Sequence, residues 1–319
     1  LLWVPARPVA GEFEVLAADV GQGSAVLIRT ASGSVLYDAG PQWSLHADAG
    51  QRVLRPLLQA LGERPSHVVL SHRDADHVGG ALGVLQGLPQ AQVWASLPPS
   101  QLVSRLSAPE LVAEVMGEWA AAPTDIPFAP TVGDPAGGSG AQPWPTQLGG
   151  RRWTRCEAGQ QWEMDGVRFR VLHPGVHHYG RKTDSNNLSC VLWVQGRQAS
   201  ALLTGDLDAA HEAELVQAHP DLRADWLLAP HHGSKTSSSP ALLAQVQPRW
   251  VVVQAGYRNR YGHPAAEVVR RYHDMGVQWV GTPDCGAARW DSARPDETAC
   301  TRQARQRYWH ARPTRIAPP

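Results

Sequence analysis

Two imidazoles and two carboxylates lie within the series HRDADH at residues 72–77 of this chain. The series directly follows the apolar run VVL at residues 68–70, so we expect a buried strand to deliver the four side chains into one tight loop. Zn²⁺ and Mn²⁺ both accept mixed imidazole and carboxylate ligands, and the harder Mn²⁺ prefers oxygen. Two interleaved pairs, His72 with Asp74 and Asp76 with His77, suit two adjacent metal ions. The alternative is a charged surface turn. Further candidate ligands later in the chain make that alternative less favoured.

Three more predicted strands end in residues of the same kinds. They lead into TGD at 204–206, PHHGS at 230–234 and YGHP at 261–264. Asp206 is placed to bridge two ions, and His231 and His232 are further candidate ligands at a strand end. Each residue alone has an ordinary alternative: a helix cap for Asp206, a turn for the histidine pair and a packed loop ring for His263. Four strand ends with the same ligand types favour a metal site.

The elements that must position these residues alternate between strands and helices in both halves of the chain. We predict strands at residues 13–19, 25–29, 35–38, 68–71, 92–95, 167–172, 188–194, 199–204, 226–229, 250–254 and 278–281. We predict helices at 52–61, 78–85, 208–218, 240–246 and 265–275. This mixture indicates an α/β fold in which two sheets pack together with helices outside. Residues 123–150, rich in glycine and proline, are expected to form a flexible insertion.

The composition of the chain argues against two classes of protein, strongly basic nucleic-acid-binding modules and membrane-spanning proteins. The 319 residues are 43% hydrophobic and 18% charged, as in an ordinary globular protein. Lys plus Arg and Asp plus Glu both number 29, so no global basic field indicates a high-affinity nucleic-acid-binding module. No apolar run is long enough to cross a membrane. The chain also begins without Met or a recognisable signal peptide, so we expect it to be a piece of something longer.

The four cysteines allow three disulfide connectivities or free thiols. Cys285 and Cys300 flank a polar loop, and a disulfide between them would suit an oxidising compartment. No pair has the Cys-x-x-Cys spacing of a structural zinc site.

Taken together, the motifs resemble the metallo-β-lactamase superfamily. They are DVGQG at 19–23, HxDxDH at 72–77, NNLS at 186–189, TGD at 204–206, HHGS at 231–234 and YGHP at 261–264. Within that superfamily they are most similar to the C-terminal domain of the ComEC competence proteins. The resemblance implies an αββα sandwich with a two-metal site at one edge of the sheets. It divides the chain into a linker at 1–12 from an upstream membrane region, the domain at 13–292 and a polar extension at 293–319.

The resemblance also implies roles for individual residues. His72 and Asp74 would bind one ion, Asp76 and His77 the other, and Asp206 would lie between them. One of His231 and His232 would complete the second ion's ligands. Asp19 would support the ligand loop through hydrogen bonds, and His263 at the mouth would contact a phosphate or donate a proton. A phosphate contact is also expected from Ser234, Lys235 and Thr236, which follow the histidine pair.

Three positions depart from the family pattern. Asp74 replaces the commoner histidine, and Asn186 or Asn187 stands where a further histidine ligand is expected. Both changes reduce the nitrogen ligands, so two divalent ions are expected with Mn²⁺ favoured and Zn²⁺ possible, and with no small organic cofactor. Ser24 replaces a supporting aspartate, which predicts looser order around the ligands.

By resemblance, the domain is a metal-dependent nuclease that degrades the DNA strand not imported during natural transformation. Its partners would be DNA and the membrane channel of the same full-length protein, at the periplasmic or extracellular face of the inner membrane. One alternative is a hydrolase of a small phosphodiester, which many upstream transmembrane segments would exclude. Another is a metal-poor domain that binds DNA or a partner, which an Asp76→Ala variant that kept its function would support. A β-lactamase fits least, because Asp74 and the asparagine pair depart from zinc lactamases.

Overall fold

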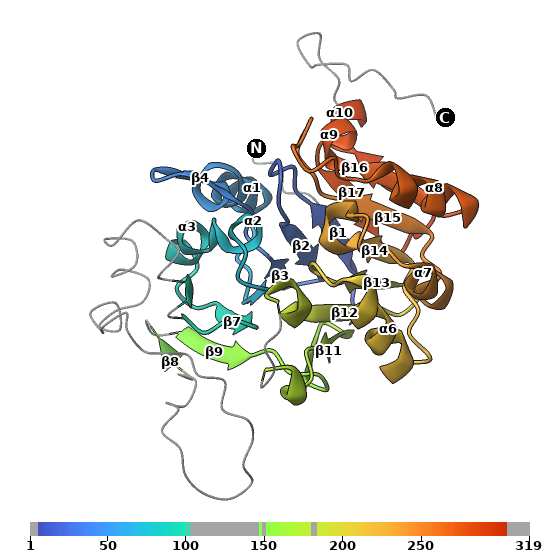
Figure 1. The fold of residues 1–319 in the computed structure, drawn as a ribbon. Coiled ribbons are helices and arrows are strands. Elements are labelled where there is room, and N and C mark those ends of the chain that lie inside the picture. Colours follow the sequence, from blue (N-terminus) through green and yellow to red (C-terminus); the bar gives the residue numbers. More distant parts are fainter. Residues whose placement is uncertain (1–5, 100, 103–146, 149–150, 180–183, 305–319) are drawn as a thin grey trace, which may run out of the picture.

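The computed structural model describes residues 6–99, 101–102, 147–148, 151–179 and 184–304, which form two large sheets with helices outside them (Figure 1). The first sheet has the order β18 (Thr298–Cys300), β17 (Ala288–Asp291), β1 (Glu14–Ala17), β2 (Val26–Arg29), β3 (Ser34–Tyr37), β6 (His67–Leu70), β7 (Gln92–Ala95), β9 (Arg151–Arg155), β8 (Gln147–Leu148). The second has the order β10 (Gln161–Met164), β11 (Val167–His173), β12 (Val191–Gln195), β13 (Ser200–Leu203), β14 (Trp226–Leu228), β15 (Trp250–Val253), β16 (Gln278–Gly281). A hairpin of β4 (Gln42–Ser44) and β5 (Ala47–Asp48) stands apart from both.

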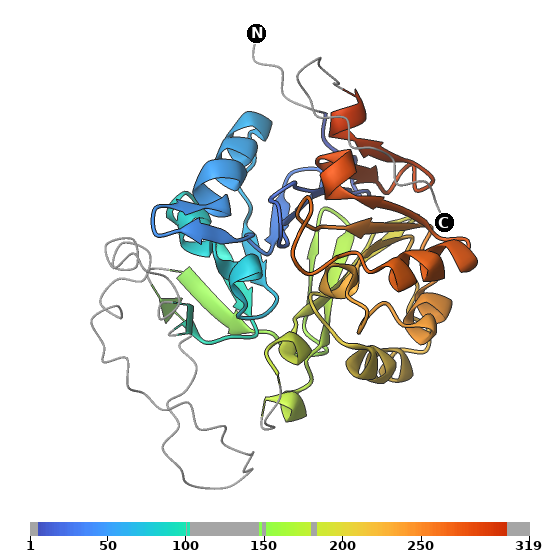
Figure 2. The same ribbon diagram turned by 45° about the horizontal axis from the view of Figure 1, so that its top comes forward.

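Helices cover the outer face of each sheet. Those on the first sheet are the π-helix η1 (Gly50–Leu54), α1 (Arg55–Leu61), α2 (Ala75–Val78) and α3 (Ala81–Gln86). Those on the second are α6 (Ala209–Ala218), α7 (Pro240–Val246) and α8 (Ala266–Asp274). In Figure 2 the two helical layers lie on opposite sides of the paired sheets. Short helices complete the chain: η3 (Val176–His178), η4 (Asn186–Leu188), η5 (Pro230–Gly233), α9 (Thr282–Cys285) and α10 (Thr301–Ala304).

Three apolar cores hold these layers together, and alternation along the strands connects them. In β1, Val15 faces the core between the sheets, whereas its neighbour Leu16 faces the core under α1 and α3. In β13, Leu203 faces the core between the sheets and Leu202 faces the core under α6 and α7. Successive strand side chains point to opposite faces, so each such strand contributes to two cores. The result confirms the predicted αββα sandwich.

The parallel parts of both sheets position the predicted ligands. Strands β3, β6, β7 and β9 run parallel in the first sheet, and β13 to β16 run parallel in the second. The carboxyl ends of neighbouring parallel strands meet at one edge of a sheet, which is where such folds bind ligands. The loops that carry the candidate ligands leave these ends.

Helix formation begins earlier than predicted around the first motif. The expected helix at 78–85 is two helices, α2 and α3, and α2 begins at Ala75. Asp76 and His77 therefore lie on a helix instead of in the loop. The break falls at Gly79, where an added Cβ would lie 2.1 Å from the backbone nitrogen of Gln42.

Both expected chain extensions join the domain where the structure describes them. Strand β18 pairs with β17 beyond residue 292, and a disulfide joins Cys285 to Cys300. At the other end, the Arg7 guanidinium donates hydrogen bonds to the Ala31 carbonyl at 3.0 Å and to Glu63 at 2.6 Å. The described parts of both predicted extensions thus contact the domain. The insertion expected at 123–150 lies outside the described residues apart from 147–148, which form β8.

A second disulfide, Cys156–Cys190, connects the end of β9 in the first sheet to the start of β12 in the second. The described residues contain no free cysteine. The expected Cys285–Cys300 pairing is confirmed, and the Cys156–Cys190 pairing completes the connectivity that composition left open. Within the described residues, no helix is both long enough and apolar enough to cross a bilayer.

Candidate metal centre

Three strand ends bring the candidate ligands together. His72 follows β6, and α2 then presents Asp76 and His77 one turn further along. Asp206 follows β13 and His232 lies in η5 after β14, so the second sheet supplies the opposite wall. Four of these five side chains are buried, and only Asp76 is partly exposed.

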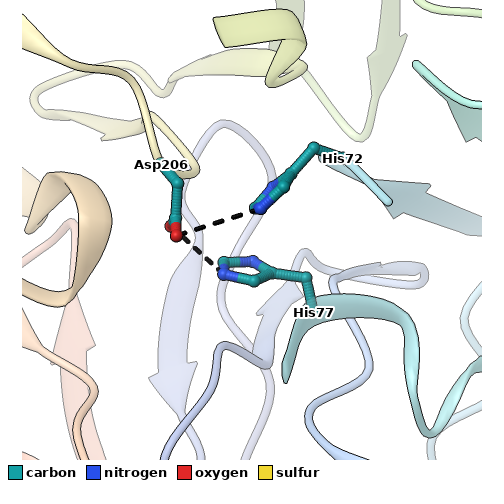
Figure 3. A group of neighbouring side chains, drawn as sticks. All are labelled: His72, His77 and Asp206. Carbon is teal, nitrogen blue, oxygen red and sulfur yellow. Dashed lines mark ion pairs between the residues drawn. The ribbon is translucent and has the colours of Figure 1, made fainter. Parts of the chain in front are cut away.

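Two groups of ligand atoms have the spacing that a metal ion needs. In the first group, His72, His77 and Asp206 each offer an atom within 4.8 Å of the others. Figure 3 shows the Asp206 carboxylate facing both rings, at 3.1 Å from His77 Nε2 and 3.9 Å from His72 Nε2. The second group consists of Asp76, His77 and His232. His232 Nε2 lies 3.3 Å from the Asp76 carboxylate and 3.6 Å from that of Asp206.

The outer nitrogens of two ligand rings are held by fixed acceptors. His77 Nδ1 donates to the Asp38 carboxylate at 2.7 Å, and His232 Nδ1 donates to the Gln254 carbonyl at 2.8 Å. These bonds select the tautomers whose Nε2 lone pairs point into the centre, as partners of metal-binding histidines do. The two Nε2 atoms then face each other at 3.1 Å, a contact that requires a cation or a proton between them.

Asp38 is a functional residue that the sequence analysis missed. It follows β3 in a left-handed conformation with φ of 59° and is completely buried. Besides His77, its carboxylate accepts hydrogen bonds from the backbone N–H and the hydroxyl of Ser71, at 2.7 and 2.9 Å. The available signal was its position as the last residue of a predicted strand, and a carboxylate at a strand end is also the signal that identified Asp206.

Ser189 and Gln254 are two further supporting residues that were missed. The Ser189 hydroxyl accepts the Asp206 N–H at 2.9 Å and lies 3.4 Å from His72 Nδ1. The buried Gln254 amide donates to the carbonyls of Ala18 and Ala25, which fixes the strand end whose carbonyl orients His232. Ser189 ends the NNLS motif and Gln254 ends a predicted strand, but neither residue type by itself indicates a metal site.

The electrostatics of the centre suit bound cations. Burial would lower the pKa of His77, but the Asp206 and Asp38 carboxylates outweigh it and raise that pKa well above its usual value. Burial would raise the pKa of the Asp206 carboxyl, but His77 and His232 hold it well below its usual range. Burial, together with the charge of His77, lowers the pKa of His72 to about 3.

A buried atom without a partner gives the clearest sign that a metal fits. Within the described residues, His72 Nε2 is fully enclosed and has no hydrogen-bond partner. An unpaired buried acceptor is costly, and a metal ion would remove that cost. The fold and these ligand groups indicate a divalent metal site that uses imidazole nitrogen and carboxylate oxygen.

The structure regroups the ligands relative to the expected pairs. Asp74 stands directly before α2 and is partly exposed, with its carboxylate 3.9 Å from His72 Nε2, and it belongs to neither three-residue group. Of the two candidate histidines, His232 is buried in the second group. His231 lies at the rim, 3.7 Å from the Asp206 carboxylate and 3.5 Å from the Asn186 amide nitrogen.

The predicted third-motif substitutes separate in the structure. Asn186 reaches the rim of the centre through His231. Asn187 donates instead to the Asp208 carboxylate at 3.0 Å, at the start of α6. The backbone of η4 thus places Asn186 and Ser189, but not the Asn187 side chain, beside the candidate ligands.

Asp19 does not have the predicted supporting role. Its carboxylate pairs with Arg302 at 2.5 Å and accepts the Gly21 N–H at 3.4 Å, so it holds the start of the β1–β2 turn to α10. Asp38 supports the ligands instead. Ser24, which predicted looser order, donates its N–H to the Asp76 carbonyl at 3.0 Å. Its hydroxyl donates to the Gln254 side chain at 3.0 Å. Ser24 therefore holds the residue whose carbonyl orients His232, in place of the support expected from an aspartate.

His263 and the loop after η5 surround the mouth. The His263 ring lies 5.9 Å from that of His231 and 6.3 Å from that of His232, between ring centres. Burial and the charges of His232 and His231 lower the pKa of His263 to about 4, which favours a neutral ring over a proton donor. The Ser234 hydroxyl is buried against that of Thr236, whereas Lys235 is exposed.

Comparison with known proteins identifies a family model and several relatives that this chain resembles. The model of the "Metallo-beta-lactamase superfamily" matches residues 18–141. Competence protein ComA of Neisseria gonorrhoeae is 31% identical over 98% of this chain and 37% of its own length. Recombination protein 2 of Haemophilus influenzae is 30% identical over 94% of this chain and 31% of its own length.

A third relative is the uncharacterized protein YcaI of Escherichia coli. It is 29% identical over 89% of this chain and 30% of its own length. The chain thus spans about a third of the length of the curated relatives it matches.

Proposed function

Because this chain is a metallo-β-lactamase domain with homologues among the ComEC-family competence proteins, we propose that it is a metal-dependent nuclease acting in DNA uptake. The fold supports a metal-dependent hydrolase in general, and the relatives support a role in competence. Phosphodiester hydrolysis of DNA, which degrades the strand that is not imported, is the specific activity that we propose.

One observation carries the proposal most strongly: two three-residue ligand groups share His77 at the carboxyl edge of the sheets. Asp206 in the first group also lies 3.6 Å from His232 of the second, so its carboxylate can serve both. His77 Nε2 has one lone pair and can bind one ion, so the Asp206 carboxylate, with its two oxygens, is what would allow a second ion beside the first. The converging ligands weigh against the metal-poor binding domain. Two bound divalent ions would activate a water and stabilise charge on a phosphodiester.

The chain's own residues perform the remaining tasks. Asp38 and the Gln254 carbonyl fix the ring orientations of His77 and His232, so the ligand atoms need little rearrangement. Lys235 is exposed beside η5 and is placed to attract a phosphate. His263 borders the mouth as a neutral ring that can exchange a hydrogen bond with substrate.

We propose Mn²⁺ as the preferred ion, with Zn²⁺ as the second candidate. Three carboxylates, those of Asp74, Asp76 and Asp206, lie within 3.9 Å of a ligand imidazole. Oxygen-rich shells favour Mn²⁺, whereas the three converging imidazoles also suit Zn²⁺.

The proposal extends to the location and the partners of the domain. We propose that this domain belongs to a larger membrane protein, whose channel part carries the imported strand while the domain faces the periplasm or the cell exterior. Cys156–Cys190 and Cys285–Cys300 support an oxidising compartment, where disulfides persist.

The test is degradation of single-stranded and duplex DNA by the chain with added Mn²⁺, Zn²⁺ or Mg²⁺, beside Asp76→Ala. A chromogenic phosphodiester, bis(p-nitrophenyl) phosphate, serves as the small substrate. The proposal predicts metal-dependent DNA cleavage that the variant loses. If the small substrate is cleaved and DNA is not, the phosphodiesterase alternative is correct. If DNA is bound and neither substrate is cleaved, the chain is a binding domain.

A further inference from the structure

A short loop beside the metal centre has an unusual set of exposed side chains. It occupies residues 254–265 between β15 and α8, and it contains no Asp or Glu. Tyr257 and Tyr261 are 63% and 54% exposed, and Arg258 and Arg260 beside them are also exposed. The whole chain has no net charge, so this concentration of two arginines without a counterion in the loop is local.

An arginine guanidinium lies over the ring of each of these two tyrosines. Arg258 lies over the ring of Tyr257 at 5.2 Å, and Arg260 lies over that of Tyr261 at 4.9 Å, from carbon to ring centre. Such pairs present flat surfaces on which a nucleobase can stack, next to a cation that can pair with a phosphate.

The loop is held in one conformation by Asn259. Its amide group donates to the carbonyls of Gly256 and His263, at 3.0 and 2.6 Å. Its carbonyl oxygen accepts the N–H groups of Tyr261 and His263, at 3.2 and 3.0 Å. Because these bonds fix the loop before any ligand arrives, binding need not overcome the entropy of ordering it.

A stack of rings connects this loop to the candidate ligands. The Tyr261 ring is 5.7 Å from that of His263, which is 6.3 Å from that of His232, and both pairs are close to parallel. On the other side of the loop, the Gly256 N–H donates to Gln22 at 3.1 Å, and Gln22 neighbours Gly23, which packs on Asp76. A strand stacked on the loop would therefore run toward the centre.

We propose that Tyr257, Arg258, Arg260 and Tyr261 form a binding site for single-stranded DNA, with bases stacked on the rings and phosphates paired with the guanidiniums. This rests on the proposed nuclease function, because the site would deliver the strand to the metal centre. Stacking needs unpaired bases, so the loop selects single strands over duplex without selecting sequence.

The experiment measures binding without cleavage. Fluorescence anisotropy of a labelled oligothymidylate and of a duplex of equal length is recorded with the chain in EDTA. The proposal predicts tighter binding of the oligothymidylate, and an affinity about five- to tenfold lower in Tyr257→Ala. Tyr257→Phe keeps the stacking ring and is expected to bind like the parent chain.

The arginines are tested through salt. Arg258→Ala combined with Arg260→Ala is expected to reduce the slope of log affinity against log salt by about 1.4. Arg168→Ala is the matched control, because Arg168 is exposed on β11, which is separated from β15 by three strands of the second sheet. Circular dichroism checks that each variant is folded.

Unchanged affinity in Tyr257→Ala, or equal affinity for duplex and single strand, would overturn the inference. Binding that depends on Tyr257 without any metal-dependent cleavage would keep the inference and remove the nuclease function. If the chain cleaves DNA with metal and Tyr257→Ala leaves the KM for single strands unchanged, the nuclease function stands and the binding site at the loop does not.

Discussion

At the scale of single residues, His77 contacts the supporting carboxylate of Asp38 and two other candidate ligands, Asp206 and His232. Its Nδ1 donates to Asp38, while its Nε2 faces both the Asp206 carboxylate and His232 Nε2 within 3.1 Å. Both ligand groups include this ring, so its orientation affects the two sites together. The residue that sets that orientation is Asp38.

The first prediction compares Asp38→Asn with Asp19→Asn. An amide at Asp38 would no longer hold the His77 Nδ1–H as a carboxylate does, so metal affinity is expected to fall about 10- to 100-fold. Asp19 pairs with Arg302 away from the ligands, so Asp19→Asn is expected to bind metal like the parent. Titration calorimetry with Mn²⁺ measures both, and a larger loss in Asp19→Asn would restore the role first predicted for that residue.

The second prediction concerns pH. The pKa of His77 is raised well above 6.5, so the metal-free ring is protonated at pH 7 and must release that proton before Nε2 binds a cation. Metal affinity is therefore expected to rise with pH through neutrality. The pKa of His72 is lowered to about 3, so this ring adds no pH dependence above about pH 4.

Calorimetry in PIPES and in Tris counts the protons released, because the two buffers differ in ionisation enthalpy. The pKa of His232, whose Nε2 faces that of His77, is also raised, so we expect at least one proton per chain from this pair at pH 7 and fewer as the pH rises. The absence of proton release at pH 7 would show that His77 is already neutral.

Sequence could identify the residues that end strands and have ligand chemistry, such as His72 and Asp206. It could not identify the residues that act through a tertiary contact. Asp38 precedes His77 by 39 positions, and the Gln254 side chain bonds to Ala18 from 236 positions away. Serine, glutamine and a lone aspartate occur in many turns, so only the assembled fold distinguishes these three residues.

At the scale of elements, the β1–β2 turn is what positions helix α2. Gly23 has φ of 135°, and a Cβ there would lie 2.2 Å from the Asp76 carbonyl oxygen. The next residue, Ser24, donates its N–H to that same oxygen. The turn and the ligand helix are thus in backbone contact, which leaves no room for a side chain.

The third prediction is that Gly23→Ala displaces α2 and lowers metal affinity by about tenfold or more, as loss of a supporting contact does. Gly21→Ala is the matched control. Gly21 also has a left-handed φ, of 75°, but nothing lies within 4 Å of its added Cβ. Equal metal affinity in the two variants would mean that backbone strain, and not the contact with Asp76, governs the effect.

The elements themselves were predicted well where strands are apolar and buried. The expected strand at 188–194 begins only at Val191, because residues 186–188 form η4. Strands β9, β10, β17 and β18 were missed. They alternate exposed with buried or partly buried residues, and β17 pairs with β1, which lies far away in sequence, so local patterns gave little signal.

At the scale of the whole molecule, the metal centre exists only while the two sheets stay in register. The Cys156–Cys190 disulfide connects them, and the Cys190 N–H donates to the Ser71 carbonyl at 2.8 Å, directly before His72. The Tyr37 hydroxyl donates to the Cys190 carbonyl from the first sheet, also at 2.8 Å. This disulfide therefore affects both stability and the site.

The fourth prediction removes each disulfide by replacing both cysteines with alanine. Loops of 34 and 15 residues predict losses of about 3–4 kcal/mol for Cys156–Cys190 and about 3 kcal/mol for Cys285–Cys300, measured by urea unfolding. Only the first removal is expected to weaken Mn²⁺ binding in the folded protein. Equal metal affinity in both double variants would contradict the structural role given to Cys190.

The proposed two-ion nuclease is tested most directly by following DNA cleavage and metal content together. The chain is stripped with a chelator, Mn²⁺ is added back stepwise, and cleavage of a labelled single strand is recorded at each step beside Asp206→Asn. Activity is expected to rise as two ions bind, and the variant is expected to stay inactive at every metal concentration. Cleavage that persists in the stripped chain, or in Asp206→Asn at full strength, would contradict it.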